Sequence, residues 1–238
     1  MRRRAGAVNP VMKPASLSVV VPALGESAGI QAALQALAPL VARGAQIIVA
    51  DGGSTDGTAT RALAVGAHVV HAPRGRALQM NAGAQHASGD ILLFLHADTR
   101  LPPDADRLIT QALASGPHVW GRFDVCIDGR PRMLRVIAAF MNRRSRWTDI
   151  ATGDQAMFMT RAAFDVVDGF PDQPLMEDIE MSKRLLKLSR PACLRQRVVT
   201  SGRRWEARGV WRTVLLMWRL RLAYWRGAAP EHLAELYR

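Results

Sequence analysis

The chain has 238 residues, of which 49% are hydrophobic and 22% are charged. This much apolar material can bury a sizeable core, and it excludes an intrinsically disordered chain. The two cysteines, Cys126 and Cys193, are too few for a disulfide scaffold and form no CxxC zinc pair. The formal net charge of +12 raises nucleic acid or an anionic membrane as a partner.

The basic excess lies in the second half of the chain. Residues 1–128 have 11 basic and 9 acidic side chains, whereas residues 129–238 have 21 and 11. Residues 130–146 hold six basic and no acidic side chains, and residues 203–226 hold seven and one. Only three of the 32 basic residues are lysines in a chain rich in alanine, so part of the arginine content reflects base composition. We therefore expect no nucleic-acid partner.

Strand and helix patterns alternate through the first hundred residues. Short apolar, β-branched runs predict strands at residues 17–21, 46–50, 67–71 and 91–95. Helices are predicted at residues 27–41, after the turn at 51–57, and at 76–87. Strand–helix units with loops of ordinary length predict an α/β fold with a doubly wound, Rossmann-like, mostly parallel sheet flanked by helices.

The pattern is less regular after residue 102. Helices are predicted at residues 105–114, 131–146, 177–188 and 210–226, with a short helix after Pro230. Strands are predicted at residues 119–127, 156–159 and 195–200, and we expect them to extend the same sheet. Residues 16–238 would then form one domain behind a basic tail of residues 1–15.

No segment is predicted to span a membrane or to direct export. The most apolar stretch, residues 209–227, is interrupted by Arg212, Arg219 and Arg221. The arginines at positions 2–4 resemble the start of a signal peptide, but residues 9–14 break the apolar region that would have to follow. We therefore expect a cytoplasmic protein.

The last long helix is predicted to be amphipathic. Arg212, Arg219 and Arg226 recur every seven residues, and the apolar side is predicted to carry Val210, Trp211, Val214, Leu215, Trp218, Leu222 and Trp225. Such a helix either lies peripherally on an anionic membrane or packs its apolar face on the sheet. The separate basic helix at residues 131–146 adds to the membrane alternative, and both alternatives stay open.

Carboxylates follow three of the predicted strands. Glu26, Asp51 and Asp98 come after the first, second and fourth strands, whose carboxyl ends share one edge of the sheet. Clustered acids need a cation, and Mg²⁺ binds one or two carboxylates together with phosphate oxygens. Turn formation or helix capping is the alternative role for such residues. The loop after the first strand has a single glycine, so a dinucleotide-binding fingerprint is absent.

The order and spacing of these blocks resemble family 2 of the inverting glycosyltransferases, which have the GT-A fold. The resemblance rests on residues 18–26 and 51–58, on Arg76 with Gln79 and Asn81, and on residues 96–98. Residues 153–155, 176–180 and 201–205 extend it to residues 16–226, most like a small bacterial subgroup. It implies a nucleotide-sugar half at residues 16–100 and an acceptor half at residues 101–238.

The resemblance implies a role for each matched residue. Asp98 would coordinate Mg²⁺ or Mn²⁺ on the diphosphate of a nucleotide-sugar donor, and we expect a UDP-sugar. Asp178 would be the general base that deprotonates the acceptor, with Glu177 as the alternative base. Arg203, Arg204 and Trp205 would hold leaving phosphates and shape the acceptor site. Gly153, Asp154 and Gln155 would form the acceptor loop. The residues that would hold the donor are Pro22, Ala23, Glu26, Asp51, Gly53, Arg76, Asn81 and Ala97.

The chain departs from the family pattern at two positions. Gly25 stands where members often have asparagine, and His96 replaces the first acid of the common Asp-x-Asp metal motif. His96 is kept as an auxiliary site residue.

Several functional alternatives stay open. The acids at residues 177–180 could simply stabilise a helix N-terminus, and residues 203–205 could begin a basic helix with a buried indole. The acceptor is unknown and could be lipid-linked. A sugar-phosphate nucleotidyltransferase and a non-catalytic module that binds sugar nucleotides or RNA are the other function classes.

Overall fold

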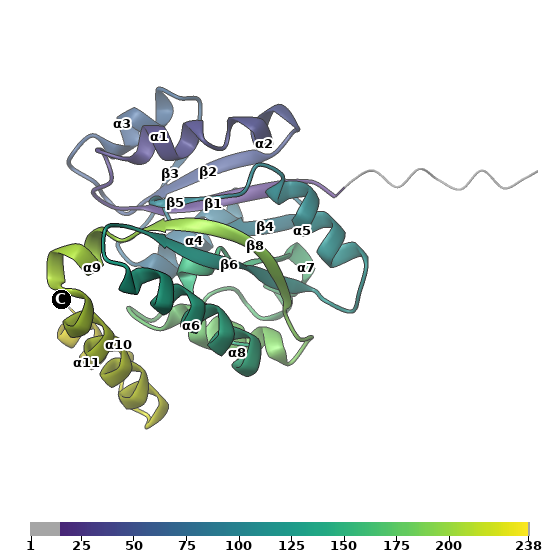
Figure 1. The fold of residues 1–238 in the computed structure, drawn as a ribbon. Coiled ribbons are helices and arrows are strands. Elements are labelled where there is room, and N and C mark those ends of the chain that lie inside the picture. The colour runs from purple at the N-terminus through teal and green to yellow at the C-terminus, as the bar shows by residue number, and fades with distance from the viewer. Residues whose placement is uncertain (1–14, 238) are drawn as a thin grey trace, which may run out of the picture.

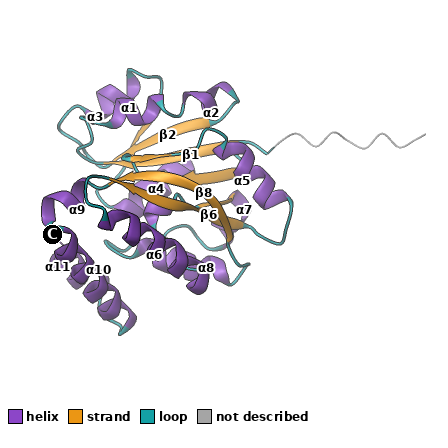
Figure 2. Cartoon of the chain, viewed as in Figure 1, coloured by secondary structure: helices purple, strands orange, loops and turns teal. Residues whose placement is uncertain are grey.

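The computed structural model describes residues 15–237, so the predicted tail lies, apart from Ala15, outside the described residues. One eight-stranded sheet crosses the molecule with helices on both faces (Figure 1, Figure 2). Its strand order is β3-β2-β1-β4-β7-β6-β8-β5. The strands are β1 (Leu17–Ala23), β2 (Gln46–Asp51), β3 (His68–His71), β4 (Ile91–Phe94), β5 (Thr99–Arg100), β6 (Trp120–Asp128), β7 (Phe158–Thr160) and β8 (Ala192–Ser201).

The first half is the predicted parallel sheet. Strand β1 pairs in parallel with β2 and β4, and β2 pairs in parallel with β3. Because successive side chains of a strand point to opposite faces, Val19 and Val21 pack with helices α1 (Ile30–Gln35), α2 (Ala38–Ala42) and α5 (Ala105–Ala114). Val20 points the other way and packs with α4 (Arg76–Gln85) and α8 (Glu177–Leu186). Burial on both faces explains the continuous apolar runs of these strands.

The later strands extend the same sheet, as predicted, but with mixed directions. Strand β7 is antiparallel to both β4 and β6, whereas β6 and β8 are parallel. The predicted helix 27–41 is two helices, because Pro39 near the start of α2 has no N–H to continue the ladder of α1. The other helices are α3 (Thr58–Leu63), α6 (Met133–Thr148), α7 (Arg161–Val166), α9 (Arg203–Arg208), α10 (Val210–Trp225) and α11 (Pro230–Tyr237). A 3-10 turn, η1, covers Gly153–Gln155.

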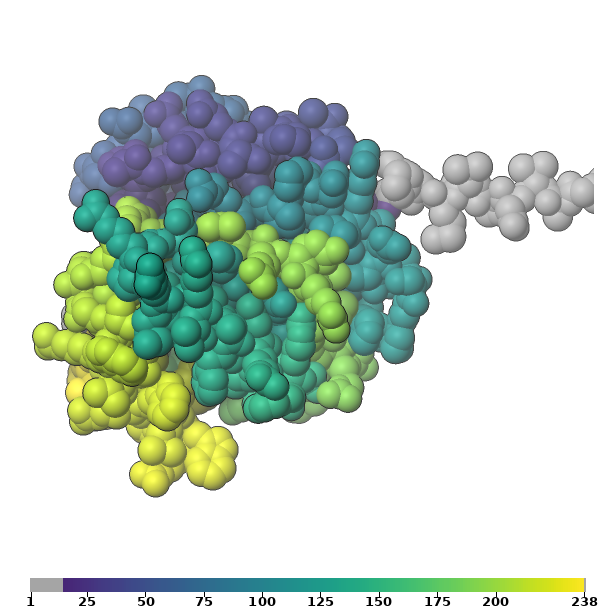
Figure 3. Space-filling model, in the orientation of Figure 1, coloured from purple at the N-terminus to yellow at the C-terminus, as the bar shows by residue number. Residues whose placement is uncertain are grey.

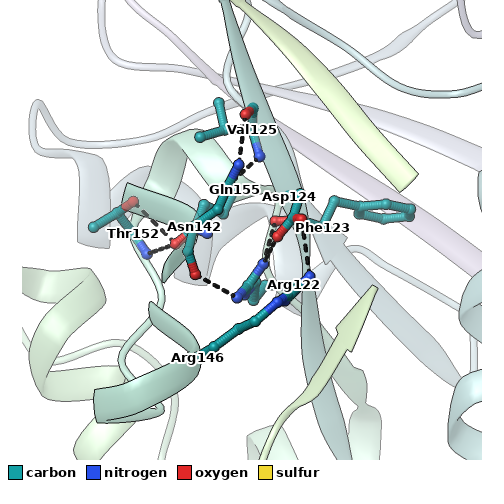
Figure 4. A network of polar contacts seen from close by, with 8 residues as sticks. All are labelled: Arg122, Phe123, Asp124, Val125, Asn142, Arg146, Thr152 and Gln155. Carbon is teal, nitrogen blue, oxygen red and sulfur yellow. Dashed lines mark hydrogen bonds and ion pairs between the residues drawn. The ribbon is translucent and has the colours of Figure 1, made fainter. Parts of the chain in front are cut away.

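A buried polar network fixes α6 against β6 (Figure 4). The guanidinium of Arg122 is fully buried and pairs with Asp124, whose other oxygen lies 2.8 Å from Arg146 Nη2 on α6. The side-chain amide of Asn142 exchanges hydrogen bonds of 2.8 and 2.9 Å with the backbone of Val125. Since Asn142 and Arg146 lie one turn apart on α6, the network sets both the position and the rotation of this helix.

Helix α10 leaves most of its predicted apolar side exposed, so that side does not pack on the sheet, and the membrane alternative stays a prediction. Its inward side packs against α11 and the loop before α8, through a cluster that includes Met176, Leu220 and Leu233. Of the predicted apolar side, only Val210 packs against the main core and Val214 is half-buried. The other members are exposed, namely Trp211, Leu215, Trp218, Leu222 and Trp225. Within residues 15–237, no helix has the length and apolar character needed to cross a membrane.

Candidate active site

Two strand ends supply carboxylates that share one arginine. Glu26 follows β1 and Asp98 follows β4, and Arg203 Nη2 lies 3.6 Å from Glu26 Oε2 and 4.0 Å from Asp98 Oδ2. Burial raises the pKa of Glu26, an effect that Arg203 opposes and Asp98 reinforces. The structure thus brings Glu26 and Asp98 to one edge of the sheet, as the sequence predicted, and places Arg203 beside both of them.

Asp51 shapes the loop that follows β2. Its Oδ2 atom accepts N–H groups from Gly53 at 3.2 Å and Ser54 at 3.0 Å, and its Oδ1 accepts the Ser54 hydroxyl. Gly53 has a φ of 89°, in the left-handed region that favours glycine. Asp51 therefore forms the turn, which was the alternative to a role in ligand binding. Its contact with the donor stays a prediction.

Helix α4 holds the ends of β1 and β2 together. Gln79 Nε2 donates to the carbonyl oxygens of Ala23 at 2.7 Å and Ala50 at 2.9 Å. Pro22 and Ala23 lie in the last positions of β1, and the buried Ala97 follows β4. These three residues stand at the predicted edge, where the backbone can approach a ligand closely.

The side chain of Asn81 binds the backbone of the loop after α7. Its side-chain amide donates to the Phe170 carbonyl and accepts the Phe170 N–H, both at 2.9 Å. Both polar atoms thus hold the loop after α7, so the structure gives Asn81 a positioning role rather than the direct donor contact that the resemblance implied.

Arg76 links the donor side to the predicted base motif. Its Nη1 atom lies 3.4 Å from Oε1 of Glu177, a residue that is only 3% exposed. Burial would lower the pKa of Arg76, but the charges of Glu177, Asp154 and Asp178 outweigh it and raise the pKa. Burial raises the pKa of Glu177, and Asp178 adds to this, while Arg76 acts in the opposite direction. The carboxylate of Glu177 is therefore paired with the guanidinium of Arg76.

Asp178 is better placed than Glu177 to act on an acceptor. It is half-buried in the first turn of α8, and its Oδ2 accepts the N–H of Gly153 at 2.9 Å. Its Oδ1 accepts the N–H of Ile179 at 2.8 Å. Asp178 and Gly153 line one small pocket with Arg76, Met80, Phe94, His96, Met157, Phe170 and Glu177. Glu177 thus pairs with Arg76, and the assignment of Asp178 as the base, with Glu177 as the alternative, stays a prediction.

His96 belongs to the acceptor loop rather than to the Asp98 edge. Its Nδ1 lies 3.3 Å from Asp154 Oδ1, and a Cβ atom at residue 153 would collide with its Nε2, so only glycine fits at Gly153. Burial would raise the pKa of Asp154, but His96, Arg76 and Arg204 outweigh it and hold the pKa below its ordinary value. His96 thus stabilises the ionised form of Asp154.

The remaining predicted residues divide between the cleft and the core. Burial lowers the pKa of Arg204, with Arg76 adding to this, while the charges of Asp154 and Asp98 oppose it. Arg204 therefore lies within electrostatic reach of both the Asp98 edge and the acceptor loop. Trp205 packs against the main core, and Gln155 is fully buried, with its Oε1 accepting the Thr152 N–H at 3.2 Å. These two residues hold the site rather than line it.

One functional candidate that the sequence pattern did not single out is Arg144, on α6. Among the residues that the structure describes, its Nε and Nη2 atoms are buried and have no hydrogen-bond partner. Burial lowers the pKa of Arg144, and the charge of Asp178 partly offsets this. The sequence predicted a basic helix here, but no periodicity distinguishes this arginine from its exposed neighbours.

The residues fit a metal held mainly by phosphate. Across residues 15–237, no group of three His, Cys, Asp or Glu side chains is arranged to bind a metal ion. Asp98 is a single carboxylate at the strand end, and the position of the first acid of the common motif is taken by His96, which faces Asp154. Mg²⁺ and Mn²⁺ accept oxygen donors, and one protein carboxylate with diphosphate oxygens is a usual set for Mg²⁺. Asp98 can supply that carboxylate.

Comparison with known proteins agrees with this geometry. The family model described as "Glycosyl transferase family 2" matches residues 18–167, which is more than half of the chain. The chain belongs to glycosyl transferase family 2. This family 2 glycosyltransferase has the predicted GT-A type of α/β fold, and the predicted enzyme class is confirmed.

Relatives whose names state an activity match only part of this glycosyltransferase. Glucosyl-3-phosphoglycerate synthase from Mycobacterium tuberculosis (strain ATCC 25618 / H37Rv) is 39% identical over 95 residues, which cover 35% of this chain and 29% of the relative. The same synthase from Mycobacterium bovis has the same identity and coverage. The matched region thus spans less than a third of these relatives.

Solved structures share the fold at low identity. TarS from S. aureus, in complex with UDP, has a TM-score of 0.63 at 17% identity, over 78% of this chain and 60% of that one. Mannosyltransferase PcManGT from Pyrobaculum calidifontis, with GDP-Man and Mn²⁺, has a TM-score of 0.62 at 22% identity, over 93% and 65%. The M. tuberculosis synthase with Mn²⁺, UDP and glucosyl-3-phosphoglycerate has a TM-score of 0.58 at 22% identity, over 78% and 71%.

Proposed function

We propose that this glycosyltransferase moves a sugar from a UDP-sugar to an acceptor hydroxyl with inversion at the anomeric carbon. The observation that carries the proposal is that arginines join both groups of acids: Arg203 Nη2 lies 3.6 Å from Glu26 and 4.0 Å from Asp98, and Arg76 Nη1 lies 3.4 Å from Glu177, next to Asp178. In the proposal, the donor and acceptor groups share one cleft. UDP and Mn²⁺ in the structures of relatives support the choice of nucleotide and metal.

Inversion by a single displacement needs one base and a stabilised leaving group. In the proposal, Asp178 accepts the acceptor proton, and the N–H of Gly153, 2.9 Å away, orients its carboxylate. Arg203 and Arg204 bind the phosphate oxygens that gain charge as the sugar leaves, because a guanidinium fork binds two oxygens. Mg²⁺ or Mn²⁺ at Asp98 would neutralise the diphosphate when bound.

The acceptor is proposed to carry a negative charge. The unpartnered guanidinium atoms of Arg144 lie within electrostatic reach of the base, and a buried charge without a partner is costly. An anionic group on the acceptor would complete this site. We further propose that the enzyme works at the inner face of a membrane on an acceptor that can be lipid-linked, because arginine-rich surfaces are attracted to anionic cytoplasmic leaflets.

Family membership removes the two other function classes. A sugar-phosphate nucleotidyltransferase and a non-catalytic binding module were open while only the strand-end acids were known. The match to glycosyl transferase family 2 places the chain among enzymes that transfer sugars.

Titration with UDP tests the donor proposal. We expect UDP to bind more tightly in Mn²⁺ than in EDTA, because Asp98 and the diphosphate share the metal. Asp98→Asn should reduce binding in Mn²⁺ to the level of the metal-free protein, measured by calorimetry. Asp104→Asn, at an exposed carboxylate outside the site, is the matched control. Equal binding with and without Mn²⁺ would contradict the metal role.

A further inference from the structure

The outer side of α10 is an apolar stripe that is open to solvent among the residues that the structure describes. Trp211, Leu215, Trp218, Leu222 and Trp225 follow a repeat of four and three residues, which aligns them along one side of the helix. The three indoles are 67%, 60% and 81% exposed. Monomeric proteins rarely leave a continuous apolar patch of this kind in water. The stripe therefore indicates a surface that is covered in use.

Helix α6 continues the stripe. Phe140 stacks on Trp218 with ring centroids 6.1 Å apart, and Val136 and Trp147 are exposed on the same side of α6. The network around Arg122 and Asp124 holds α6, and α10 packs on Met176 and Leu233, so each helix is positioned by contacts of its inner side. We call this α6–α10 face the docking surface; the C-terminal helix pair that carries part of it projects from the body (Figure 1, Figure 3).

The charges around the docking surface are of one sign. Arg212, Arg219 and Arg226 recur beside the stripe at intervals of seven residues, and Arg135 and Arg143 are exposed on α6. Neither helix contains an aspartate or a glutamate. In a dimer across this face, the arginines of one copy would lie opposite those of the other, and the repulsion between like charges disfavours that arrangement. The charge pattern favours an extended anionic partner.

A hollow on the surface adds a place for a headgroup. An open depression of about 580 Å³ is lined by Arg219, Leu222, Ala223, Arg226, Gly227 and Ala228. The guanidinium groups of Arg219 and Arg226 can bind the phosphate oxygens of a lipid headgroup there. The apolar side chains of the depression suit the glycerol backbone of the same lipid. Tryptophan favours the boundary between headgroups and acyl chains, where its ring is buried and its N–H stays wet.

We infer that the docking surface binds the interface of an anionic phospholipid bilayer. The indoles and leucines of α10 enter the headgroup boundary, and the arginines meet lipid phosphates, with no segment crossing the bilayer. The opposite side of α10 packs on Leu175, Met176 and Ile179, next to Asp178. Binding would therefore hold the acceptor side of the cleft close to the lipid. The docking surface would supply the residues for the membrane location proposed above, and binding to vesicles can be measured without catalysis.

Vesicle flotation of the full chain tests the inference. We expect the protein to float with vesicles of phosphatidylcholine and phosphatidylglycerol, to remain unbound with phosphatidylcholine alone, and to lose most binding in high salt. The double variant Trp211→Gln with Trp225→Gln should weaken binding at least tenfold. Arg219→Gln with Arg226→Gln should remove the preference for the anionic lipid.

The controls separate the docking surface from other exposed groups. Leu63→Gln changes a side chain of α3 that is also exposed, and we expect it to bind vesicles like the unaltered chain. All variants change exposed residues, and equal melting temperatures would establish that they fold. Absence of flotation, equal binding to both lipids, or a dimer that the tryptophan variants dissociate would each overturn the inference. Any of these results leaves the binding of UDP and the transferase proposal unaffected.

Discussion

Asp178→Asn is expected to remove nearly all sugar transfer while the protein still binds UDP. Asparagine can accept the N–H of Gly153 through its amide oxygen, and it loses only the contact of the second oxygen with the N–H of Ile179, so we expect the variant to fold. It cannot take the proton of the acceptor hydroxyl, and general base catalysis contributes about 10²- to 10⁴-fold to the rate. We expect kcat to fall by about that factor, measured with a UDP-sugar that the unaltered enzyme turns over.

Two neighbouring variants distinguish a lost base from a disturbed site. Arg144→Leu removes the guanidinium beside Asp178 and is expected to raise the KM for an anionic acceptor more than it lowers kcat. Glu177→Gln should weaken the pairing with Arg76 and reduce stability, with transfer retained. If Asp178→Asn keeps transfer and Glu177→Gln abolishes it, the base is Glu177.

Asp124→Ala is expected to destabilise the fold more than any other single change to a charged residue described above. The substitution leaves the fully buried guanidinium of Arg122 without its carboxylate and releases Arg146 on α6. Breaking a buried ion pair by removing one partner costs about 3–5 kcal/mol. The decrease should appear in the free energy of unfolding measured in urea.

A surface pair supplies the matched control. Asp128 lies 3.4 Å from Arg100, and both side chains are mostly exposed. Exposed pairs contribute about 0–1 kcal/mol, so Asp128→Ala should change stability little. Replacing both partners of the buried pair, Arg122→Met with Asp124→Leu, should recover part of the loss, because the fully buried guanidinium is removed together with its carboxylate and only Arg146, which is 31% exposed, loses its partner. Equal stabilities for Asp124→Ala and Asp128→Ala would show that the network does not hold α6.

The parallel half of the fold could be predicted because its signals are local. Strands β1, β2 and β4 are short apolar runs that end in turn residues or acids, and topology then brings Glu26 and Asp98 to one edge. The arginine between these acids comes from residue 203, more than a hundred positions away. The sequence supplied that residue only through a family resemblance.

The parts that could not be predicted depend on contacts between distant segments. The contact of Gly153 with His96 and Asp178 joins three elements and has no periodic signal. Asn81 matched a motif, yet its amide holds the backbone of Phe170. Helix α10 is apolar on nearly all sides, so its periodicity could not show which side packs, and the buried side proved to be the one around Leu220.

In our proposal, the strand-end acids and the residues around Asp178 form one cleft that transfers a sugar from a UDP-sugar. Release of the nucleoside diphosphate from a panel of UDP- and GDP-hexoses, followed in Mn²⁺ with the intact chain, tests this most directly. We predict turnover of at least one UDP-hexose, its loss in EDTA, and its loss in Asp98→Asn. Failure to bind or turn over any nucleotide sugar, in a preparation that unfolds cooperatively, would contradict the claim.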